Sequence, residues 1–405
     1  MHGRLLYINL DGFGRYYLHT AAARARFPAL YRLMNGGVTF DRCLTGIPSI
    51  TYPMQSAIVS GCYSQGTGNC DKYYDRAQNA VIPMRRRNDA QTIGELLRSQ
   101  DIPFVSIQQF ALEDKGATRG DARALYVQPG GDYAARFRLL LELLTHDTLT
   151  FGDQRWRFDE SPRAVFLYVD DLDSVGHNPP ACYADSEAER VSNVQRRLEE
   201  IDGMLGAVLD VINAQGDWTI LLCSDHGMIS CQGKSRIPEL AEALRACGLA
   251  RVVPHTVGPL PDADFDALLT AHDIQCQVYF KRPDVDQQAL KARLLALPFV
   301  EQVLTSRELA ARGVTPLYAD MLVSPVEGAH FSTEHRDLTA LHATHDSLHE
   351  KCQRVFAAVA GPGIRRGWRE TAPVHNIDFL PALCRRLQIG RLRDASCAPL
   401  PDIWK

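Results

Sequence analysis

Six acidic and histidine residues stand close to the ends of short apolar runs, and side chains of these two types bind divalent metal ions. Three such ligands for each of two ions would still leave room for a substrate. The mixture of carboxylates and imidazoles favours Zn²⁺, with Mn²⁺ as the alternative. The six residues are Asp11, Asp173, His177, Asp225, His226 and His345. Together they predict a centre with two divalent metal ions.

The adjacent pair Asp225 and His226 is the most informative part of this set. It lies in the sequence SDHGM directly after an apolar run. Two neighbouring ligands on a tight turn can face two sides of a metal site, whereas a lone aspartate or histidine after a strand is more often a cap or a packed side chain. The prediction therefore depends on all six residues together.

The segment 48–53, with the sequence PSITYP, carries the hydroxyl side chains of Ser49 and Thr51. In one interpretation these residues cap a helix that begins near Pro53, because serine and threonine favour the N-cap and proline favours the first turn. In the other, a metal-bound hydroxyl at a helix N-terminus loses its proton near neutral pH and attacks phosphorus. The two interpretations are compatible.

The apolar runs and the stretches between them predict how these residues are brought together. Strands are expected at 5–10, 104–107, 164–169, 218–223 and 355–360, and helices at 91–99, 133–144 and 186–214. Near-continuous apolar strands that alternate with helices indicate an α/β protein with a doubly wound, mostly parallel sheet and helices on both faces. Ligands bind at the carboxyl edge of such a sheet, so Asp11, Asp173 and Asp225 are expected to share one crevice.

Between residues 257 and 331 the pattern changes to β-α-β-β, with a helix in the sequence DQQALKARLLAL. Sheet-like periodicity resumes near residue 355. We therefore expect a small α+β cap at 257–331, inserted into a catalytic core made of residues 1–256 and 332–405.

Composition and charge exclude several classes of protein. The 405 residues include 44 basic and 48 acidic side chains, so there is no excess of positive charge for binding a nucleic acid polymer. The first apolar run is too short for an export signal or a membrane span. Eleven cysteines without a CxxC pair predict a cytoplasmic location without an obligatory disulfide, although one or two bridges are compatible with the sequence. The sequence makes no prediction of oligomeric state.

In chain order, the sequence contains LDGFG, PSITYP, DSVGH, SDHGM and a late histidine in ATHDSLHE. This order resembles the alkaline phosphatase superfamily, above all its type I phosphodiesterase/nucleotide pyrophosphatase branch, to which phosphonoacetate hydrolase is related. The resemblance spans nearly the whole chain and implies an alkaline phosphatase-like fold with two metal ions. It also implies a nucleophile, Thr51, and two ligand sets: Thr51, Asp11, Asp225 and His226 for one ion, and Asp173, His177 and His345 for the other.

The late ligand could be His345 or His342, because further histidines lie nearby at positions 349 and 375. Relatives have a glycine after this ligand, whereas this chain has Asp346. In the alternative interpretation, residues 342, 345 and 349 form a helical face with one ligand and two imidazoles that are solvated or support the ligands. We take His345 as the ligand.

Two side chains compete for the position at which diesterase relatives place an asparagine that hydrogen-bonds the phosphoryl group. Ungapped counting from Thr51 leads to Lys72, with Asn69 three positions earlier. A lysine there would favour a more highly charged phosphoryl group, such as that of a monoester, whereas Asn69 would supply a neutral donor. Tyr52 and Tyr73 are candidates for stacking on a nucleobase.

The expected function is a metal-dependent hydrolase that cleaves a phosphodiester or pyrophosphate bond of a small molecule or nucleotide through a covalent phospho-threonine. One alternative is a phosphomonoesterase or a phosphonoacetate-type C–P hydrolase on the same site. The latter needs basic groups for a carboxylate, for which Lys115 and Arg119 are candidates. A more remote alternative is a non-catalytic protein that binds a phosphorylated ligand.

Overall fold

The apolar runs at 5–10, 104–107, 164–169 and 218–223 form neighbouring strands of one sheet in the computed structural model, which describes residues 3–84, 86–262, 264–271, 274–334 and 337–405. The sheet has eight strands in the order β22–β2–β21–β11–β1–β10–β6–β7. Every adjacent pair is parallel except the two pairs that involve β21. The strands are β1 (Arg4–Leu10), β2 (Gly37–Phe40), β6 (Phe104–Ile107), β7 (Ala124–Val127), β10 (Ala164–Val169), β11 (Trp218–Cys223), β21 (Ala357–Ala360) and β22 (Trp368–Glu370). The predicted doubly wound, mostly parallel sheet is confirmed.

Parallel pairing brings three loops to one edge of this sheet. β1 pairs with β10 on one side, where Leu10 is opposite Val169, and with β11 on the other, where Asn9 is opposite Cys223. Since the three strands run in the same direction, the residues that follow them leave the sheet side by side. The segments that carry most of the predicted ligands therefore meet at the carboxyl edge.

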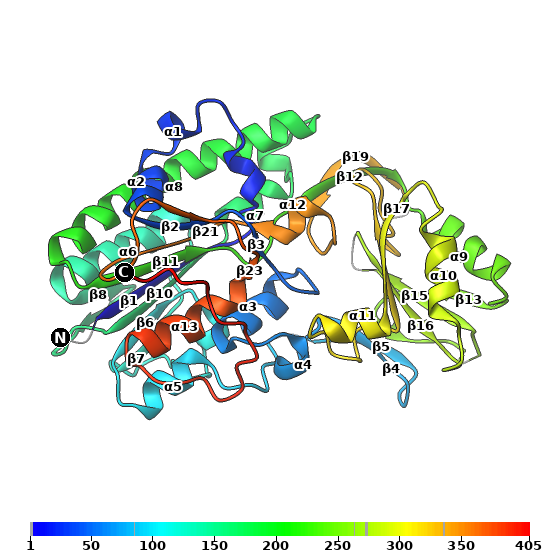
Figure 1. Cartoon of the computed structure of the whole chain (residues 1–405), viewed down its shortest axis with the longest axis horizontal. Helices are drawn as coiled ribbons and strands as arrows, with labels where there is room; N and C mark the ends of the chain where they lie inside the picture. The colour runs from blue at the N-terminus through cyan, green and yellow to red at the C-terminus, as the bar shows by residue number, and fades with distance from the viewer. Residues whose placement is uncertain (1–2, 85, 263, 272–273, 335–336) are drawn as a thin grey trace.

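Helices cover both faces of the sheet, with α2, α6 and α8 on one face and α3, α5 and α13 on the other (Figure 1). They are α2 (Pro28–Gly36), α3 (Thr51–Ser60), α5 (Ile93–Ser99), α6 (Tyr133–His146), α8 (Glu187–Gln215) and α13 (Phe379–Arg386). The three predicted helices are present within two residues at each end. The side chains of Thr92, Asp132 and Ser186 accept hydrogen bonds from the first turns of α5, α6 and α8, which fixes where these helices begin.

A second sheet with its own apolar core lies at the right of Figure 1. Its strands run in the order β13–β15–β16–β18–β17, and α9 and α10 pack against them. The unit contains α9 (Ile237–Ala246), β13 (Val252–Pro254), β15 (Ala267–Ala271), β16 (Cys276–Phe280), α10 (Gln287–Leu294), β17 (Val300–Thr305), α11 (Ser306–Ala311) and β18 (Met321–Pro325). The predicted β-α-β-β order is present, but α9 and β13 precede the predicted start at residue 257. The sequence does not mark this earlier start, because α9 joins the second core only through tertiary packing of its apolar face.

An antiparallel ribbon formed by β12 (Ile229–Lys234) and β19 (Asp337–Thr344) leads from the large sheet to this inserted unit and back (Figure 1). The shorter elements are α1 (Ala23–Arg26), β3 (Cys43–Leu44), α4 (Ser64–Thr67), β4 (Lys72–Asp75), β5 (Ala80–Pro83), β8 (Thr148–Phe151), β9 (Gln154–Arg157), α7 (Asp171–Gly176), β14 (Gly258–Pro259), α12 (Glu350–Gln353), β20 (Arg354–Val355) and β23 (Val374–His375). The C-terminal end of β19 returns the chain to the carboxyl edge of the large sheet, where His345 follows it.

Neither a membrane-spanning helix nor a disulfide occurs within the described ranges. Every helix there is too short or too polar to cross a bilayer. All eleven cysteines lie in these ranges, and no two of them are joined. Burial raises the pKa of the Cys223 thiol to about 12, so this side chain packs in the sheet as a neutral group.

Candidate active site

The first group of predicted ligands, Asp11, Asp225 and His226, is buried where β1 and β11 end. The ring nitrogen Nε2 of His226 lies 3.2 Å from Asp11 Oδ1 and 3.7 Å from Asp225 Oδ2. The other ring nitrogen, Nδ1, lies 3.1 Å from the carbonyl oxygen of Gly227, so Nε2 is the nitrogen that faces the carboxylates. One oxygen of each aspartate and this nitrogen are therefore close enough to bind one ion.

Hydrogen bonds from neighbouring side chains hold Asp11 and Asp225 in place. The hydroxyl of Tyr168 donates to Asp11 Oδ2. The amide of Gln55 donates to Asp225 Oδ2 at 2.9 Å, and the amide of Asn376 donates to the Asp225 carbonyl oxygen at 3.1 Å. Such contacts orient metal ligands and are part of a working site.

The second group, Asp173, His177 and His345, lies where α7 follows β10 and where the ribbon strand β19 ends. His177 Nε2 is 3.3 Å from Asp173 Oδ2, and His345 Nε2 is 3.9 Å from Asp173 Oδ1. His177 Nδ1 lies 2.9 Å from the carbonyl oxygen of Ala343 in β19. His342, the alternative late ligand, lies within β19 and belongs to neither ligand group in the described part of the chain.

The two groups adjoin, and their charges fit cations. The rings of His226 and His345 stack with their centroids 4.0 Å apart. Burial raises the pKa of the Asp11 carboxyl well above its usual value, and the negative charges of Asp225 and Asp173 raise it further. Oδ1 of Asp11 and Oδ1 of Asp173 are buried, and no described residue donates a hydrogen bond to either oxygen. Because buried carboxylates are costly without a cation, these residues fit two divalent ions.

Thr51 is the first residue of α3, and its Oγ1 lies 3.1 Å from His226 Nε2. The positive end of the helix dipole therefore lies beside the first ligand group, where it favours an anion. The capping interpretation of this segment is wrong: the N-cap residue is Ile50, and no side chain of the described residues caps α3. The hydroxyl of Ser49 bonds instead to the backbone of Ser347. A hydroxyl, a helix N-terminus and two groups of candidate metal ligands meet here, an arrangement that suits phosphoryl transfer.

Most of the chain matches one known protein family. The family model described as type I phosphodiesterase / nucleotide pyrophosphatase matches residues 5–293, which is well over half of the chain. The chain belongs to this family. The match begins in β1, which precedes Asp11, and includes both the Thr51 segment and the SDHGM turn.

Relatives of this family and their structures are similar over different lengths. The bis(5'-adenosyl)-triphosphatase enpp4 of Xenopus laevis is 22% identical over 99% of this chain and 82% of its own. ENPP4 of Homo sapiens is 22% identical over 56% of this chain. The match covers 48% of ENPP4, so this chain spans only about half the length of that relative. The structure of murine ectonucleotide pyrophosphatase / phosphodiesterase 5 has a TM-score of 0.65 at 17% identity, and covers 99% of this chain and 97% of that one. An inactive form of that murine protein, 16% identical and with the same TM-score, was solved in complex with AMP. These similarities confirm the predicted alkaline phosphatase-like fold.

The two candidates for the phosphoryl contact in this family member are both buried. The side-chain amide of Asn69 donates to the carbonyl oxygen of Arg87 at 2.9 Å, so it acts within the core. Lys72 is the first residue of β4 and lies near Asp346. Burial raises the pKa of Asp346 to about 7, and the Lys72 ammonium opposes that rise. Lys72 therefore adds a positive charge beside the segment that carries His345.

The two candidate tyrosines have different surroundings. Tyr52 follows Thr51 directly and is half-buried, and its ring meets the ring of Phe110 edge-on with centroids 5.0 Å apart. Tyr73 packs against an apolar cluster that includes Ile47 and Leu304. Tyr52 thus lies beside Thr51, whereas Tyr73 contributes to packing.

The basic residues predicted to bind a carboxylate form ion pairs near the surface. Lys115 Nζ lies 3.9 Å from Glu95 Oε1. Arg119 Nη2 lies 2.7 Å from Glu113 Oε1, and its side chain is 63% exposed. Both charges already have carboxylate partners, so the phosphonoacetate alternative loses the support of these two residues.

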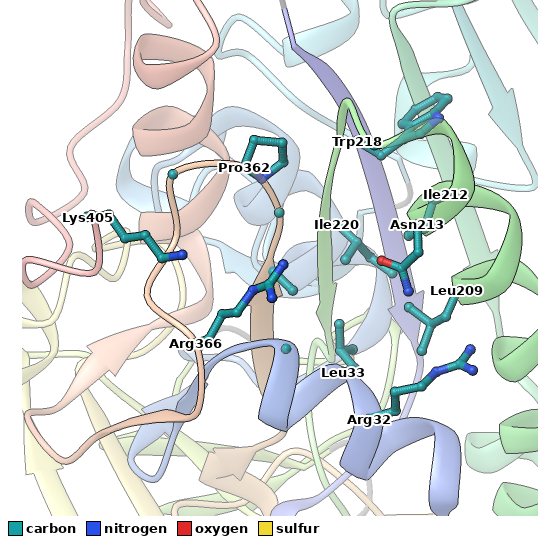
Figure 2. A pocket seen from close by; sticks show the side chains of 15 residues that line it. Arg32, Leu33, Leu209, Ile212, Asn213, Trp218, Ile220, Pro362, Arg366 and Lys405 are labelled. Atoms are coloured by element: carbon teal, nitrogen blue, oxygen red, sulfur yellow. The ribbon is translucent and has the colours of Figure 1, made fainter.

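A cavity of about 520 Å³ at the opposite edge of the large sheet is not part of this site. It is lined by Trp218 at the start of β11, by Ile220 and by basic side chains that include Arg32 and Arg366 (Figure 2). Asp225 follows the other end of the same strand. The cavity contains none of the predicted ligands, so it does not compete with the carboxyl edge as the candidate active site.

Three side chains that hold the ligands were not predicted from the sequence. Gln55 lies one turn after Thr51, and a polar residue inside an otherwise buried helix is a signal that could have identified it. Tyr168 is opposite Asn9 in the sheet, so it could be found only from the register of two strands. Asn376 follows Asp225 by 151 positions, and no local pattern marks its role.

Proposed function

We propose that this chain is a metal-dependent phosphoric ester hydrolase that cleaves a phosphodiester or pyrophosphate bond of a nucleotide or another small molecule. The observation that carries the proposal is the Thr51 hydroxyl at a helix N-terminus beside two adjoining ligand groups. Family membership supports the reaction class. The proposed cofactors are two divalent ions, Zn²⁺ by ligand type, held by Thr51 and the six predicted ligands.

The proposed reaction proceeds through a covalent phospho-threonine. Bound divalent ions would lower the pKa of the hydroxyl and neutralise charge on the phosphoryl group. Thr51 Oγ1 attacks phosphorus in line with the leaving oxygen, so the bond from phosphorus to that oxygen breaks as the bond to Oγ1 forms. Water then attacks the same phosphorus from the opposite side, which breaks the bond to Oγ1 and releases the product. Two inversions give net retention of configuration at phosphorus.

A nucleotide is the proposed substrate class. Tyr52 and Phe110 expose parts of an aromatic pair directly beside Thr51. A partly exposed aromatic ring suits stacking on a nucleobase. A related murine structure contains AMP, which agrees with this substrate class.

A panel of substrates tests the proposal. The protein is reconstituted with Zn²⁺ and assayed with a nitrophenyl phosphodiester, the matching monoester, a dinucleoside polyphosphate and phosphonoacetate. We expect the diester or the polyphosphate to give the highest kcat/KM. Preferential hydrolysis of phosphonoacetate would contradict the proposed bond type, and binding of the panel without turnover would favour the non-catalytic alternative.

A phosphomonoesterase is the second candidate function, because the buried ammonium of Lys72 suits a phosphoryl group of higher charge. If Lys72 contacts the phosphoryl group, Lys72→Asn should lower kcat/KM for the monoester about tenfold more than for the diester, the order expected for a charged hydrogen bond. Lys115→Asn removes a lysine that pairs with Glu95 and is the matched control. Equal effects of Lys72→Asn on both substrates would leave the monoesterase candidate without support.

Removal of the Tyr168 hydroxyl should weaken metal binding. Tyr168→Phe deletes the donor to Asp11 Oδ2 while keeping the ring that packs against Phe110. Loss of a contact that orients a ligand costs about tenfold or more in metal affinity. Competition with a chromophoric chelator measures this affinity, and Tyr126→Phe, which removes a buried hydroxyl elsewhere in the sheet, is the control. Equal Zn²⁺ affinities of the wild type and Tyr168→Phe would contradict the assigned role.

The cytoplasmic location stays a prediction from cysteine usage. That the partners include neither a nucleic acid polymer nor a membrane also stays a prediction. The proposed partner is a small phosphorylated molecule.

A further inference from the structure

The segment that follows His345 lies against the inserted unit through several hydrogen bonds. Gln275 Nε2 donates to Asp346 Oδ1 at 2.5 Å. The backbone N–H of Leu348 donates to Ser324 Oγ at 3.0 Å, and the side-chain amide of Gln302 donates to the Leu348 carbonyl oxygen at 2.8 Å. Side chains of β17, β18 and the residue preceding β16 therefore hold residues 346–348.

The other side of the same segment contacts the chain that leads to the nucleophile. The backbone N–H of Asp346 donates to the carbonyl oxygen of Ser49 at 3.1 Å. The backbone N–H of Ser347 donates to Ser49 Oγ at 3.2 Å. Residues 346–348 thus connect the inserted unit with the segment that carries Thr51, and His345 is covalently attached to this connection.

An aspartate at position 346 lowers the stability of the fold unless its carboxylate forms contacts that compensate. Its φ of 66° is left-handed, which a glycine adopts without strain and an aspartate adopts less readily. Its side chain is 3% exposed, so the carboxylate has lost most of its hydration. In return it accepts hydrogen bonds from Gln275 and from the Tyr318 hydroxyl at 3.4 Å, and both donors belong to the inserted unit.

We propose that Asp346 is a positioning residue whose carboxylate fixes the His345 segment against the inserted unit and so sets the place of His345 in the second ligand group. The inserted unit thereby holds His345 in place at the metal centre, in addition to any contact with substrate. This inference rests on the proposed function, because it assumes that His345 binds an ion.

Asp346→Gly tests this role without straining the backbone, because glycine tolerates the left-handed φ. We expect this variant to keep its fold and its first ion but to bind the second ion about tenfold to a hundredfold more weakly, the range for loss of a contact that orients a ligand. Chelator competition and elemental analysis after dialysis measure the change, and circular dichroism checks the fold. His345→Ala is the reference for complete loss of this ligand.

Further variants separate positioning from general stability. Gln275→Leu should reproduce the defect. The double variant Asp346→Gly/Gln275→Leu should bind the second ion no more weakly than Asp346→Gly alone, because each substitution removes the same hydrogen bond between Gln275 and Asp346. Asp346→Asn keeps an acceptor for Gln275 and should largely restore binding. Thr270→Val, which removes a buried hydroxyl of the inserted unit, should have no effect on either ion.

Two results distinguish failure of the positioning role from failure of the proposed function. If Asp346→Gly and Gln275→Leu both bind two ions with wild-type affinity, the positioning role is wrong while the proposed function stands. If the wild type itself binds no divalent ion, the proposed function fails first.

Discussion

Thr51→Ala is expected to lower kcat for the preferred phosphoester by about a thousandfold or more, because the variant lacks the oxygen that attacks phosphorus in the proposed mechanism. The hydroxyl lies 3.1 Å from His226 Nε2 at the first residue of α3. Its removal should leave the second ligand group, Asp173, His177 and His345, able to bind an ion. Steady-state kinetics with the substrates of the panel measure the loss, and elemental analysis measures the ions retained.

Thr51→Ser is the matched control, because it keeps a hydroxyl at the helix N-terminus and should retain substantial activity. Acid quenching of the wild type during turnover of a labelled substrate should trap the phosphoryl group on Thr51, and with a diester substrate this group still carries the substituent that has not left. A Thr51→Ala variant with more than a tenth of wild-type kcat would contradict the nucleophile assignment. Inversion of configuration in a chiral-phosphate assay would contradict the covalent step even if Thr51 is essential.

Removal of divalent ions is expected to abolish activity and to lower the free energy of unfolding. Asp11 and Asp225 are buried, and the partly buried Asp173 lies near them. Burial, together with the charges of the other two carboxylates, raises the pKa of Asp11. Without cations their repulsion is uncompensated. An ion present at a hundredfold excess over its Kd adds about 2.7 kcal/mol to the free energy of unfolding. Dialysis against a chelator, thermal unfolding and reconstitution with Zn²⁺ or Mn²⁺ measure both effects.

Single histidine variants assign the ions to the two groups. His226→Ala should lose one ion and His345→Ala the other, each with near-complete loss of activity. His342→Ala is the matched control, because this histidine is three positions away in β19 and lies in neither ligand group of the described residues. Loss of an ion in His342→Ala but not in His345→Ala would make His342 the late ligand. Full activity of the chelated protein would contradict the metal-dependent mechanism.

Several features of the fold could be predicted because they depend on local patterns. Strands β1, β10 and β11 are near-continuous apolar runs, and each is followed by polar residues. Parallel strands end at the same edge, so the common location of Asp11, Asp173 and Asp225 follows from the topology without knowledge of side-chain contacts. Helix α5 begins where Thr92 and Glu95 form a capping box, a signal within four residues.

Other features depend on contacts between distant segments. The inserted unit begins before residue 257, because α9 packs its apolar face on a sheet formed by later strands. The capping interpretation of Thr51 was wrong because the hydroxyl is turned towards His226, 175 positions away. The pairing of Lys115 and Arg119 with glutamates likewise depends on how loops fold at the surface.

The sequence by itself determined the α/β class, the strand ends, and the kinds of side chain available for two ions and a nucleophile. Only the tertiary structure decided that His345 rather than His342 joins Asp173 and His177, and that Gln275 reaches Asp346 across 71 positions. The physical reason is that periodicity and turn residues act over a few positions. Hydrogen bonds between buried groups, in contrast, form only after the core and the inserted unit have packed and excluded water.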